Sequence, residues 1–283
     1  MIHNINMKKI GLFILCILFA ISVIPINHST CSADTAVELP IIMYHSLLKS
    51  RTGQYITSPA KLRSDIQWLA DHGYTSVLVK DIIAHCEGRT PLPAKPVLIS
   101  FDDGHYNNYY YGFQILKDMG FKANINIIGC NSEFCSTHED RDNPNYSHLT
   151  WAEIKEMQES GVFEVGNHTY NMHKFKPRYG IAKMYNEDNA TYAANLKKDI
   201  MQLEEKLQSE CGFRTNIFAF PFGKYSKESI DILSSLGFKA FLTCNEHINH
   251  LEFGNKEKLR GLGRYNRDGR KTTYQFMKDC GLA

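Results

Sequence analysis

The sequence feature that most limits the fold is a short apolar run that ends in two adjacent carboxylates. Residues 97–101 read Val-Leu-Ile-Ser-Phe, a pattern typical of a strand buried on both faces. Asp102, Asp103 and Gly104 follow directly. Successive side chains of a strand point in opposite directions, so one aspartate can hold a metal or orient a group while the other handles a proton. The alternative is a solvated Asp-Asp-Gly turn.

Strands and helices are predicted to alternate along the chain. Ser58 and Thr150 mark helix starts, and Gly73, Gly120 and Gly161 mark helix ends. This alternation predicts a parallel sheet, and seven or eight units in one run predict a TIM-like α/β barrel with its chemistry at the carboxyl ends of the strands. The strands are predicted at residues 39–44, 74–79, 97–101, 122–128, 162–166, 216–220, 238–243 and 259–265, with long loops over 129–149 and 174–189.

The first 33 residues are predicted to be an export signal and not a part of the barrel. Lys8 and Lys9 precede an apolar run over residues 10–24, and a small-residue site follows at Ala33. An uncleaved membrane anchor is the alternative, although the run is short for a membrane span. The expected division is therefore a signal or anchor over 1–33 and one catalytic domain over 34–283, located outside the cytoplasm.

Charge and cysteine content argue against two classes of function. Residues 1–33 hold two lysines and no acids, so 30 basic and 30 acidic residues remain in the rest of the chain. This balance gives no electrostatic case for nucleic-acid binding. Six cysteines remain but none forms a Cys-x-x-Cys pair, which argues against a cysteine zinc site. Cys130 and Cys135 either close a small disulfide loop or stay as thiols.

Polar or turn-forming residues follow four of the predicted strands, and in a barrel all these strand ends face the same rim. His168 and His173 are five residues apart, about 140° around a helix, so they can act together only from a loop. Two imidazoles and one carboxylate suit Zn²⁺ or a similar divalent ion. The four strand ends carry His45, then Asp102 and Asp103, then His168 to His173, then Phe220-Pro221-Phe222-Gly223.

Three of these motifs resemble those of the NodB-type polysaccharide deacetylases, carbohydrate esterase family four. They occur in family order, and the resemblance spans residues 39–280. It implies a deformed (β/α)₇ barrel that removes N- or O-acetyl groups from a glycan. It also implies that Asp102 is the general base and that Asp103, His168 and His173 hold the metal. Zinc is the expected ion, and cobalt and nickel suit the same ligands. The motifs are Ser100 to Gly104, His168-Thr169 through His173, and Phe220 to Gly223.

Three departures from the common family pattern point to one branch. The second histidine is His173, one position later than usual, and Ala219 stands where many members carry arginine. Arg264 is the predicted replacement for that arginine. No Leu-x-His motif follows near the C-terminus, so the general acid is predicted in Tyr44-His45. These features resemble the poly-N-acetylglucosamine deacetylases, whose strand order is permuted. His247 and His250 are fallback acids.

The predicted reaction is the hydrolysis of an acetamide on a glycan. Asp102 takes a proton from the attacking water, and His45 protonates the departing amine. A backbone N–H near Phe222, within the motif that contains Pro221, stabilises the oxyanion. The predicted substrate is poly-N-acetylglucosamine, a chitin-type polymer or peptidoglycan, and the enzyme is expected to be a monomer. Tyr106, Tyr109 and Tyr110 contact sugar faces or pack in a helix.

Three other functions are compatible with parts of the pattern. One is an O-acetyl esterase acting on a xylan-like glycan. Another is a catalytically silent barrel that binds glycan or cell wall, although such a protein has no use for a base beside a metal site. The third is a non-haem iron oxygenase, whose ligands usually sit on an antiparallel barrel, against the alternation found here.

Overall fold

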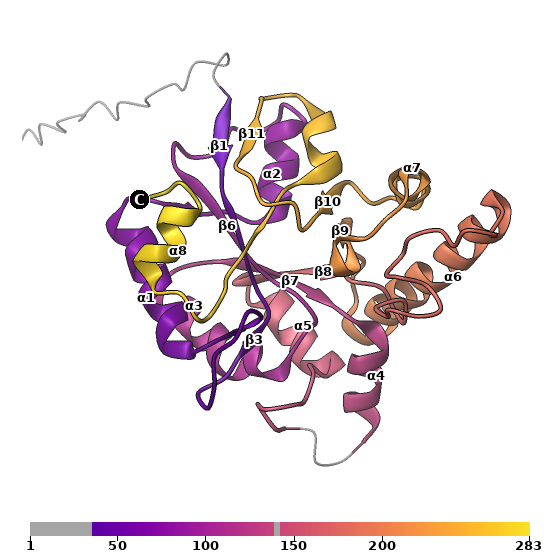
Figure 1. The fold of residues 1–283 in the computed structure, drawn as a ribbon, viewed down its shortest axis with the longest axis horizontal. Helices are drawn as coiled ribbons and strands as arrows, with labels where there is room; N and C mark the ends of the chain where they lie inside the picture. The colour runs from indigo at the N-terminus through magenta and orange to yellow at the C-terminus, as the bar shows by residue number, and fades with distance from the viewer. Residues whose placement is uncertain (1–35, 139–141) are drawn as a thin grey trace, which may run out of the picture. The chain divides into compact units, whose positions relative to one another are not determined.

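A curled parallel sheet organises the computed structural model, which describes residues 36–138 and 142–283 (Figure 1). The predicted signal segment, residues 1–33, lies outside the described residues. Seven strands follow one another in the order β10-β9-β8-β7-β6-β2-β12, and β5 pairs with the start of β6. The strands of this sheet are β2 (Ile41–Tyr44), β5 (Thr75–Ser76), β6 (Pro96–Phe101), β7 (Ala123–Ile127), β8 (Phe163–Asn167), β9 (Ile217–Ala219), β10 (Ala240–Leu242) and β12 (Tyr265–Asn266).

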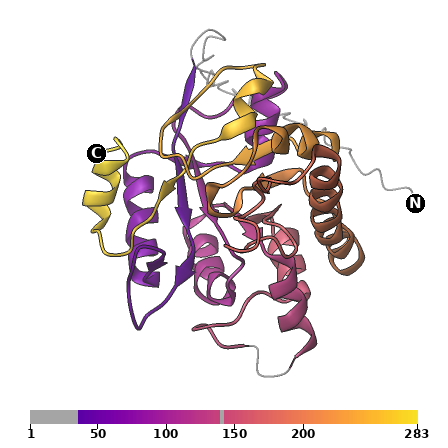
Figure 2. The ribbon, with the colours of Figure 1, turned by 45° about the vertical axis from the view of Figure 1, so that its right-hand side comes forward.

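Two short strand pairs stand beside the main sheet. β1 (Val37–Leu39) pairs antiparallel with β11 (Asn249–Leu251), and β3 (Ser46–Leu47) pairs parallel with β4 (Ile56–Thr57). α8 lies beside α1 in both views (Figure 1, Figure 2). The helices are α1 (Pro59–Asp71), α2 (Val79–Cys86), α3 (Gln114–Met119), α4 (Gly129–Thr137), α5 (Trp151–Glu159), α6 (Asn189–Lys206), α7 (Lys227–Ser235) and α8 (Thr273–Asp279).

Short π- and 3₁₀-helical turns complete the described residues. The π-helical turns are η1 (Asn108–Phe113), which leads into α3, and η2 (Leu207–Cys211), which extends α6. The 3₁₀ turns are η3 (Pro221–Gly223) and η4 (Lys256–Gly261). In the two described ranges, no helix has both the length and the apolar character that crossing a membrane requires.

The segment over residues 262–267 connects the two edges of the sheet. Leu262 forms a parallel bridge with Leu242 of β10, and its carbonyl accepts the Thr243 N–H at 2.8 Å. Three residues later, β12 pairs with β2 at the opposite edge. The predicted deformed barrel is therefore confirmed. The predicted strand over 259–265 is wrong, because this segment changes hydrogen-bonding partner within a few residues and cannot form a long ladder.

The prediction of a long loop over residues 129–149 is also wrong for its first half, which forms α4. Tertiary contacts hold this polar helix in place. The Glu133 carboxylate accepts hydrogen bonds from the Trp151 indole at 2.9 Å and from the Lys206 ammonium at 3.0 Å. The predicted loop over 174–189 is free of helices and strands until α6 begins at Asn189.

Near the ends of the strands, alternate side chains point to opposite faces of the sheet. Apolar side chains point outward to the helices, and polar side chains point into the barrel. Ile99 and Phe101 of β6 belong to the apolar core shared with α1, α3 and α5. Between them, Ser100 is fully buried on the other face, where its hydroxyl donates to the Asn124 side chain at 3.3 Å. A buried polar layer therefore lies directly beneath the carboxyl ends of the strands.

Candidate active site

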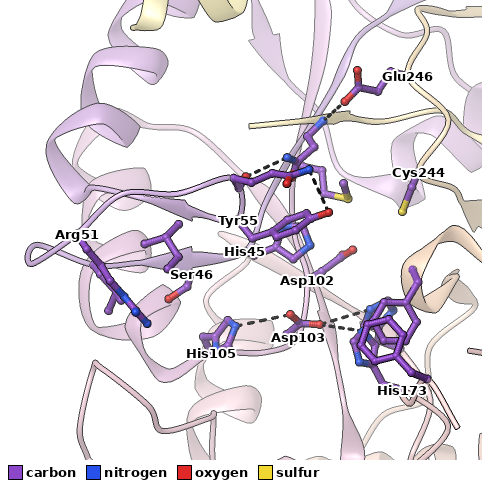
Figure 3. Close-up of a pocket in the computed structure, with 18 of the residues that line it drawn as sticks. His45, Ser46, Arg51, Tyr55, Asp102, Asp103, His105, His173, Cys244 and Glu246 are labelled. Carbon is purple, nitrogen blue, oxygen red and sulfur yellow. Dashed lines mark hydrogen bonds and ion pairs between the residues drawn. The ribbon is translucent and has the colours of Figure 1, made fainter. Parts of the chain in front are cut away.

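A cavity of about 700 Å³ lies at the carboxyl ends of β2, β6 and β8 (Figure 3). Most of the residues predicted from the strand ends meet there, although their positions in the sequence span nearly 180 residues. Pro221 is buried and lies outside the cavity lining. The predicted residues that line the cavity are His45, Asp102, Asp103, His168, His173 and Phe222.

Asp103, His168 and His173 form a cluster with the dimensions of a metal site. Their potential ligand atoms all lie within 4.8 Å of one another. The Asp103 Oδ1 atom is 3.6 Å from His168 Nε2 and 3.4 Å from His173 Nε2. Tetrahedral ligands with bonds of about 2.0–2.2 Å are separated by about 3.3–3.6 Å, so these spacings match. Asp103 Oδ1 is also buried without a hydrogen-bond partner, which is expected of an oxygen that binds a cation.

The backbone fixes the ring of His168 in the orientation that a metal ligand needs. Its Nδ1 atom lies 2.8 Å from the carbonyl oxygen of Ala219 at the end of β9. A carbonyl oxygen only accepts, so Nδ1 carries the proton and the Nε2 lone pair faces Asp103. Burial lowers the pKa of His168 to about 4, against the opposite effect of Asp102, so the ring is neutral near pH 7. Neutral imidazole is the form that binds metals.

Asp102 points away from the cluster and is held by Arg264. The guanidinium donates from Nη1 to Oδ1 at 2.7 Å and from Nη2 to Oδ2 at 2.8 Å, and both side chains are buried. Asn126 of β7 donates a third hydrogen bond to Oδ1 at 2.8 Å. Burial raises the pKa of Asp102, but Arg264 and His168 outweigh it and hold the pKa at about 2. Oδ2 receives only the Arg264 bond among the described residues, so it keeps acceptor capacity.

The polar layer inside the barrel supports this pair. Arg264 also donates from Nη1 to the Ser100 hydroxyl at 3.1 Å and from Nε to the Thr243 carbonyl at 2.9 Å. A Cβ atom on Gly166 of β8 would lie 2.1 Å from Asn126 Oδ1. Glycine at this position therefore makes room for the asparagine that orients Asp102. Arg264 thus lies beside Asp102, as predicted for the replacement of the usual arginine.

His45 lies at the cavity end of β2, and the fallback histidines lie elsewhere. Its half-buried ring contacts Tyr55 edge-on at 4.9 Å, and its Nδ1 atom is buried without a partner. Burial lowers the pKa of His45, against the raising effects of Asp103 and Asp102. His247 and His250 line a separate cavity of about 310 Å³.

The aromatic residues of the predicted motifs divide between cavity and core. Phe222 adopts a left-handed backbone conformation (φ 57°) and its ring lies 4.2 Å from that of His173. Phe175 stacks on Phe222 at 4.4 Å and also lines the cavity. Tyr106 is 8% exposed, packs near Tyr109, and is not brought to the cavity.

Several residues that line the cavity carry no strong signal in the sequence and were not predicted. His105 follows the Asp-Asp-Gly motif directly, and its Nε2 atom lies 3.6 Å from Asp103 Oδ2. Its position beside the motif was a usable signal. The others come from loops with no repeating pattern, so no sequence signal predicted their position here. They include Arg51, Gln54, Tyr55, Phe175, Tyr179 and Glu246.

Known proteins resemble this chain in sequence and in fold. A family model described as polysaccharide deacetylase matches residues 89–241, more than half of the chain. The poly-β-1,6-N-acetyl-D-glucosamine N-deacetylase of Escherichia coli K12 is 26% identical over 226 residues, which is 71% of this chain and 33% of the relative. The enzyme of the same name from Staphylococcus aureus MRSA252 is 25% identical over 193 residues, 68% of this chain and 62% of the relative.

The chain thus spans about a third of the length of the E. coli relative and under two thirds of the S. aureus relative. A solved de-N-acetylase structure from Aggregatibacter actinomycetemcomitans has the same fold, with a TM-score of 0.73 and 23% identity over 86% of this chain and 99% of that one. From the family-model match and the barrel that carries its motifs, we conclude that the chain belongs to the polysaccharide deacetylase family.

Proposed function

We propose that this protein is a metal-dependent N-deacetylase that acts on a β-linked N-acetylglucosamine polymer, with poly-β-1,6-N-acetylglucosamine as the first candidate. The observation that carries the proposal is the arrangement of two adjacent carboxylates. Asp103 and two histidines form a cluster with the spacing of a metal site. Asp102 lines the same cavity and is held by its ion pair with Arg264. The names of the similar bacterial enzymes support the choice of polymer.

Asp103, His168 and His173 would hold the divalent ion, with zinc as the first choice. When bound there, such an ion lowers the pKa of a water molecule and polarises the acetyl carbonyl. Asp102 is a carboxylate throughout the neutral range because its pKa is about 2. Its open Oδ2 position accepts a proton from the attacking water, and an acid of low pKa gives that proton up again readily.

His45 is proposed as the general acid that protonates the departing amine from its imidazolium form. Burial lowers the pKa of His45, and the nearby Asp103 and Asp102 favour the imidazolium against this effect. It lines the cavity beside Asp102, and its Nδ1 atom has no partner within the described residues. An amine is a poor leaving group until it is protonated, whereas an activated ester needs less help. His45→Ala should therefore slow an amide substrate about a hundredfold more than an activated acetyl ester. Equal losses on both substrates would remove His45 from this role.

The proposed function is tested by measuring acetate release from oligomers of β-1,6-N-acetylglucosamine, chitin, peptidoglycan and acetylated xylan. The expected result is release from the N-acetylglucosamine oligomers that stops on chelation and returns with zinc. Asp102→Asn should retain bound metal and lose about 10²- to 10⁴-fold in rate. The thermal melting temperature of the variant shows that the comparison is made on folded protein.

The same assay separates the other functions. Release from acetylated xylan alone would identify an O-acetyl esterase. Glycan affinity and bound metal without acetate release from any oligomer would identify a silent binding barrel and overturn the proposal. Activity in Asp102→Asn equal to that of the unchanged enzyme would overturn the mechanism, because the proton acceptor would then lie elsewhere.

The proposal includes export from the cytoplasm and action as a monomer. The basic and then apolar composition of residues 1–33 supports export. Cell fractionation with an antibody against the barrel tests the location, and size-exclusion chromatography with light scattering tests the monomer. Protein retained in the cytoplasmic fraction would contradict the first, and a stable dimer would contradict the second.

A further inference from the structure

One wall of the cavity is built from three segments, around Gln54, Glu246 and Asn266 of β12, that are joined by a chain of hydrogen bonds. The Asn266 backbone N–H donates to Glu246 Oε1 at 3.0 Å, and the Asn266 side chain donates to the Gln54 carbonyl at 3.0 Å. The Gln54 side chain donates to the Tyr55 hydroxyl at 3.3 Å. Figure 3 shows this chain running from Glu246 to Tyr55 along the cavity. A carboxylate and an aromatic ring are thus held on the same wall.

Close backbone contacts join the part of this wall that carries Tyr55 to the segment after β12. The Gly269 N–H donates to the Gly53 carbonyl at 3.0 Å, and a Cβ atom on Gly269 would lie 1.9 Å from the Ile56 carbonyl oxygen. The Thr57 hydroxyl also donates to the Arg267 carbonyl at 3.2 Å. The segment that carries Tyr55 and the segment that follows β12 therefore meet at a distance that only glycine permits.

Glu246 presents a negative charge to the cavity that forms no ion pair among the described residues, and Lys271, the cation it acts on, is paired with Asp279. Three carboxylates line the cavity, and the other two are already engaged: Asp102 pairs with Arg264, and Asp103 belongs to the candidate metal cluster. Glu246 accepts only the backbone N–H of Asn266, and no lysine or arginine of the described residues lies within ion-pair distance of it. Its Oε2 atom is available to a ligand.

We propose that Glu246 and Tyr55 form a subsite for the protonated amine of a glucosamine residue next to the reacting sugar. This inference rests on the proposed function, whose product is a sugar with a free amine that is cationic near neutral pH. The Glu246 carboxylate neutralises the ammonium group. The Tyr55 ring is 51% exposed and offers an apolar face to the sugar and a π-face to the cation.

The opposite side of the cavity gives this subsite a direction. Arg51 also lines the cavity, and Figure 3 shows Arg51 and Glu246 on opposite sides of Tyr55 and His45. Among the described residues, Arg51 has no carboxylate within ion-pair distance, so its guanidinium repels an ammonium group nearby. A free amine is therefore favoured on one side of the reacting residue and disfavoured on the other. The enzyme would extend an existing deacetylated stretch in one direction along the polymer.

The test uses defined β-1,6-linked trisaccharides whose central residue is acetylated. In one isomer the free amine is at the reducing end, and in the other it is at the non-reducing end. The unchanged enzyme should favour one isomer by about three- to tenfold in kcat/KM, the range expected for a partly exposed ion pair. Glu246→Gln should lower this ratio and leave only the part of the preference that comes from Arg51. Glu252→Gln is the matched control, because Glu252 is an exposed carboxylate outside the cavity that pairs with Lys258.

A binding measurement tests the subsite independently of turnover. The fully deacetylated trisaccharide should bind Glu246→Gln about three- to tenfold more weakly than the unchanged protein or Glu252→Gln by calorimetry. The difference should shrink in 0.5 M NaCl, which screens exposed charges. Equal affinity in Glu246→Gln and the unchanged protein would overturn the subsite, as would an unaltered isomer ratio in that variant. Absence of acetate release from every oligomer would instead overturn the proposed function and leave the binding result to decide the subsite.

Discussion

One short segment provides the arginines of two buried aspartate–arginine pairs, and the two pairs differ in their surroundings. Arg264 precedes β12 and clamps Asp102 at the cavity, whereas Arg267 follows β12 and clamps Asp65 of α1. An odd spacing of three residues across a strand sends the two side chains to opposite faces. All four side chains are at most 3% exposed. The same chemical pair thus occurs once beside the cavity and once in the core.

The second pair is fully satisfied. Asp65 receives Arg267 Nε at 2.7 Å and Nη2 at 3.1 Å, the Tyr44 hydroxyl at 2.8 Å and the Thr273 hydroxyl at 2.6 Å. The Arg267 guanidinium also lies 4.7 Å from the Phe276 ring centre. Four donors occupy the Asp65 oxygens, which leaves this carboxylate no capacity to take a proton from a substrate.

Asp102 has three donors where Asp65 has four, and the difference lies on the oxygen available to the cavity. A buried ion pair by itself is weak support for either stability or function. The two carboxylates differ in the number of hydrogen bonds they accept and in which oxygen lacks one. This difference separates a structural carboxylate from one that can accept a proton in catalysis. We therefore expect substitutions in the Asp65 pair to act on unfolding and those in the Asp102 pair to act on turnover.

The largest expected effect is on stability, from Asp65→Ala. It leaves Arg267 buried without a counter-charge, and such changes cost about 3–5 kcal/mol of unfolding free energy. For a domain of this size the melting temperature should fall by about 6–20 °C. Thermal denaturation measures this, and kcat/KM of the folded fraction should remain unchanged. Asp71→Ala is the control, since Asp71 is exposed on the same helix. A tenfold loss of kcat/KM in folded Asp65→Ala would abolish the distinction between the pairs.

The next effect comes from replacing each arginine with lysine, which keeps the charge and loses the two-pronged hydrogen bonding. Arg264→Lys should lower kcat/KM for acetate release about a hundredfold, because Asp102 is then free to turn away from the cavity. Arg267→Lys should lose about 2–3 kcal/mol of unfolding free energy at unchanged kcat/KM. Steady-state kinetics and urea denaturation on both variants measure this. Parallel losses of activity in the two variants would contradict the assignment.

Thr273→Val sharpens the comparison, because it removes one donor and makes Asp65 resemble Asp102 in number of hydrogen bonds. The lost bond is to a charged group and spans 2.6 Å, so we expect about 1–2 kcal/mol of destabilisation. Urea denaturation measures this. Activity should not change, because Thr273 contacts Asp65 and lies outside the cavity lining. A variant as stable as the unchanged protein would show that the fourth donor contributes nothing.

The sequence predicted the strand ends well because each carried its own signal. An apolar run followed directly by Asp102 and Asp103 marks both a buried strand and its end, and a glycine after Asp103 allows the turn. His168 was placed by the same reasoning. These predictions are local, since the residues that define the strand also carry the chemistry.

The failures concern features that depend on distant partners. The strand predicted over 259–265 has suitable residues, yet the segment bridges two sheet edges and forms only β12. Arg267 and Thr273, which donate three of the four hydrogen bonds to Asp65, lie more than 200 residues away after β12 and on α8, so no local pattern links them to Asp65. Glu246 and Tyr55 likewise line one wall only because Asn266 of β12 hydrogen-bonds to both of their segments, and hydrophobic periodicity does not predict such a link.

The smallest expected effect is a pH dependence that belongs to Asp102. Its pKa in the folded protein, about 2, is below its ordinary value of 3.8. A lowered pKa stabilises the fold above the ordinary value, and this contribution is lost as pH falls towards the folded value. The full contribution is about 2 kcal/mol, of which about 1 kcal/mol should be lost between pH 6 and pH 3. Urea denaturation of the metal-free protein measures this loss. The difference in unfolding free energy between the unchanged protein and Asp102→Asn should become smaller as the pH falls from 6 to 3. A gap that stays constant would mean that Arg264 does not stabilise the ionised form, and the chemical distinction between the two pairs would lose its electrostatic basis.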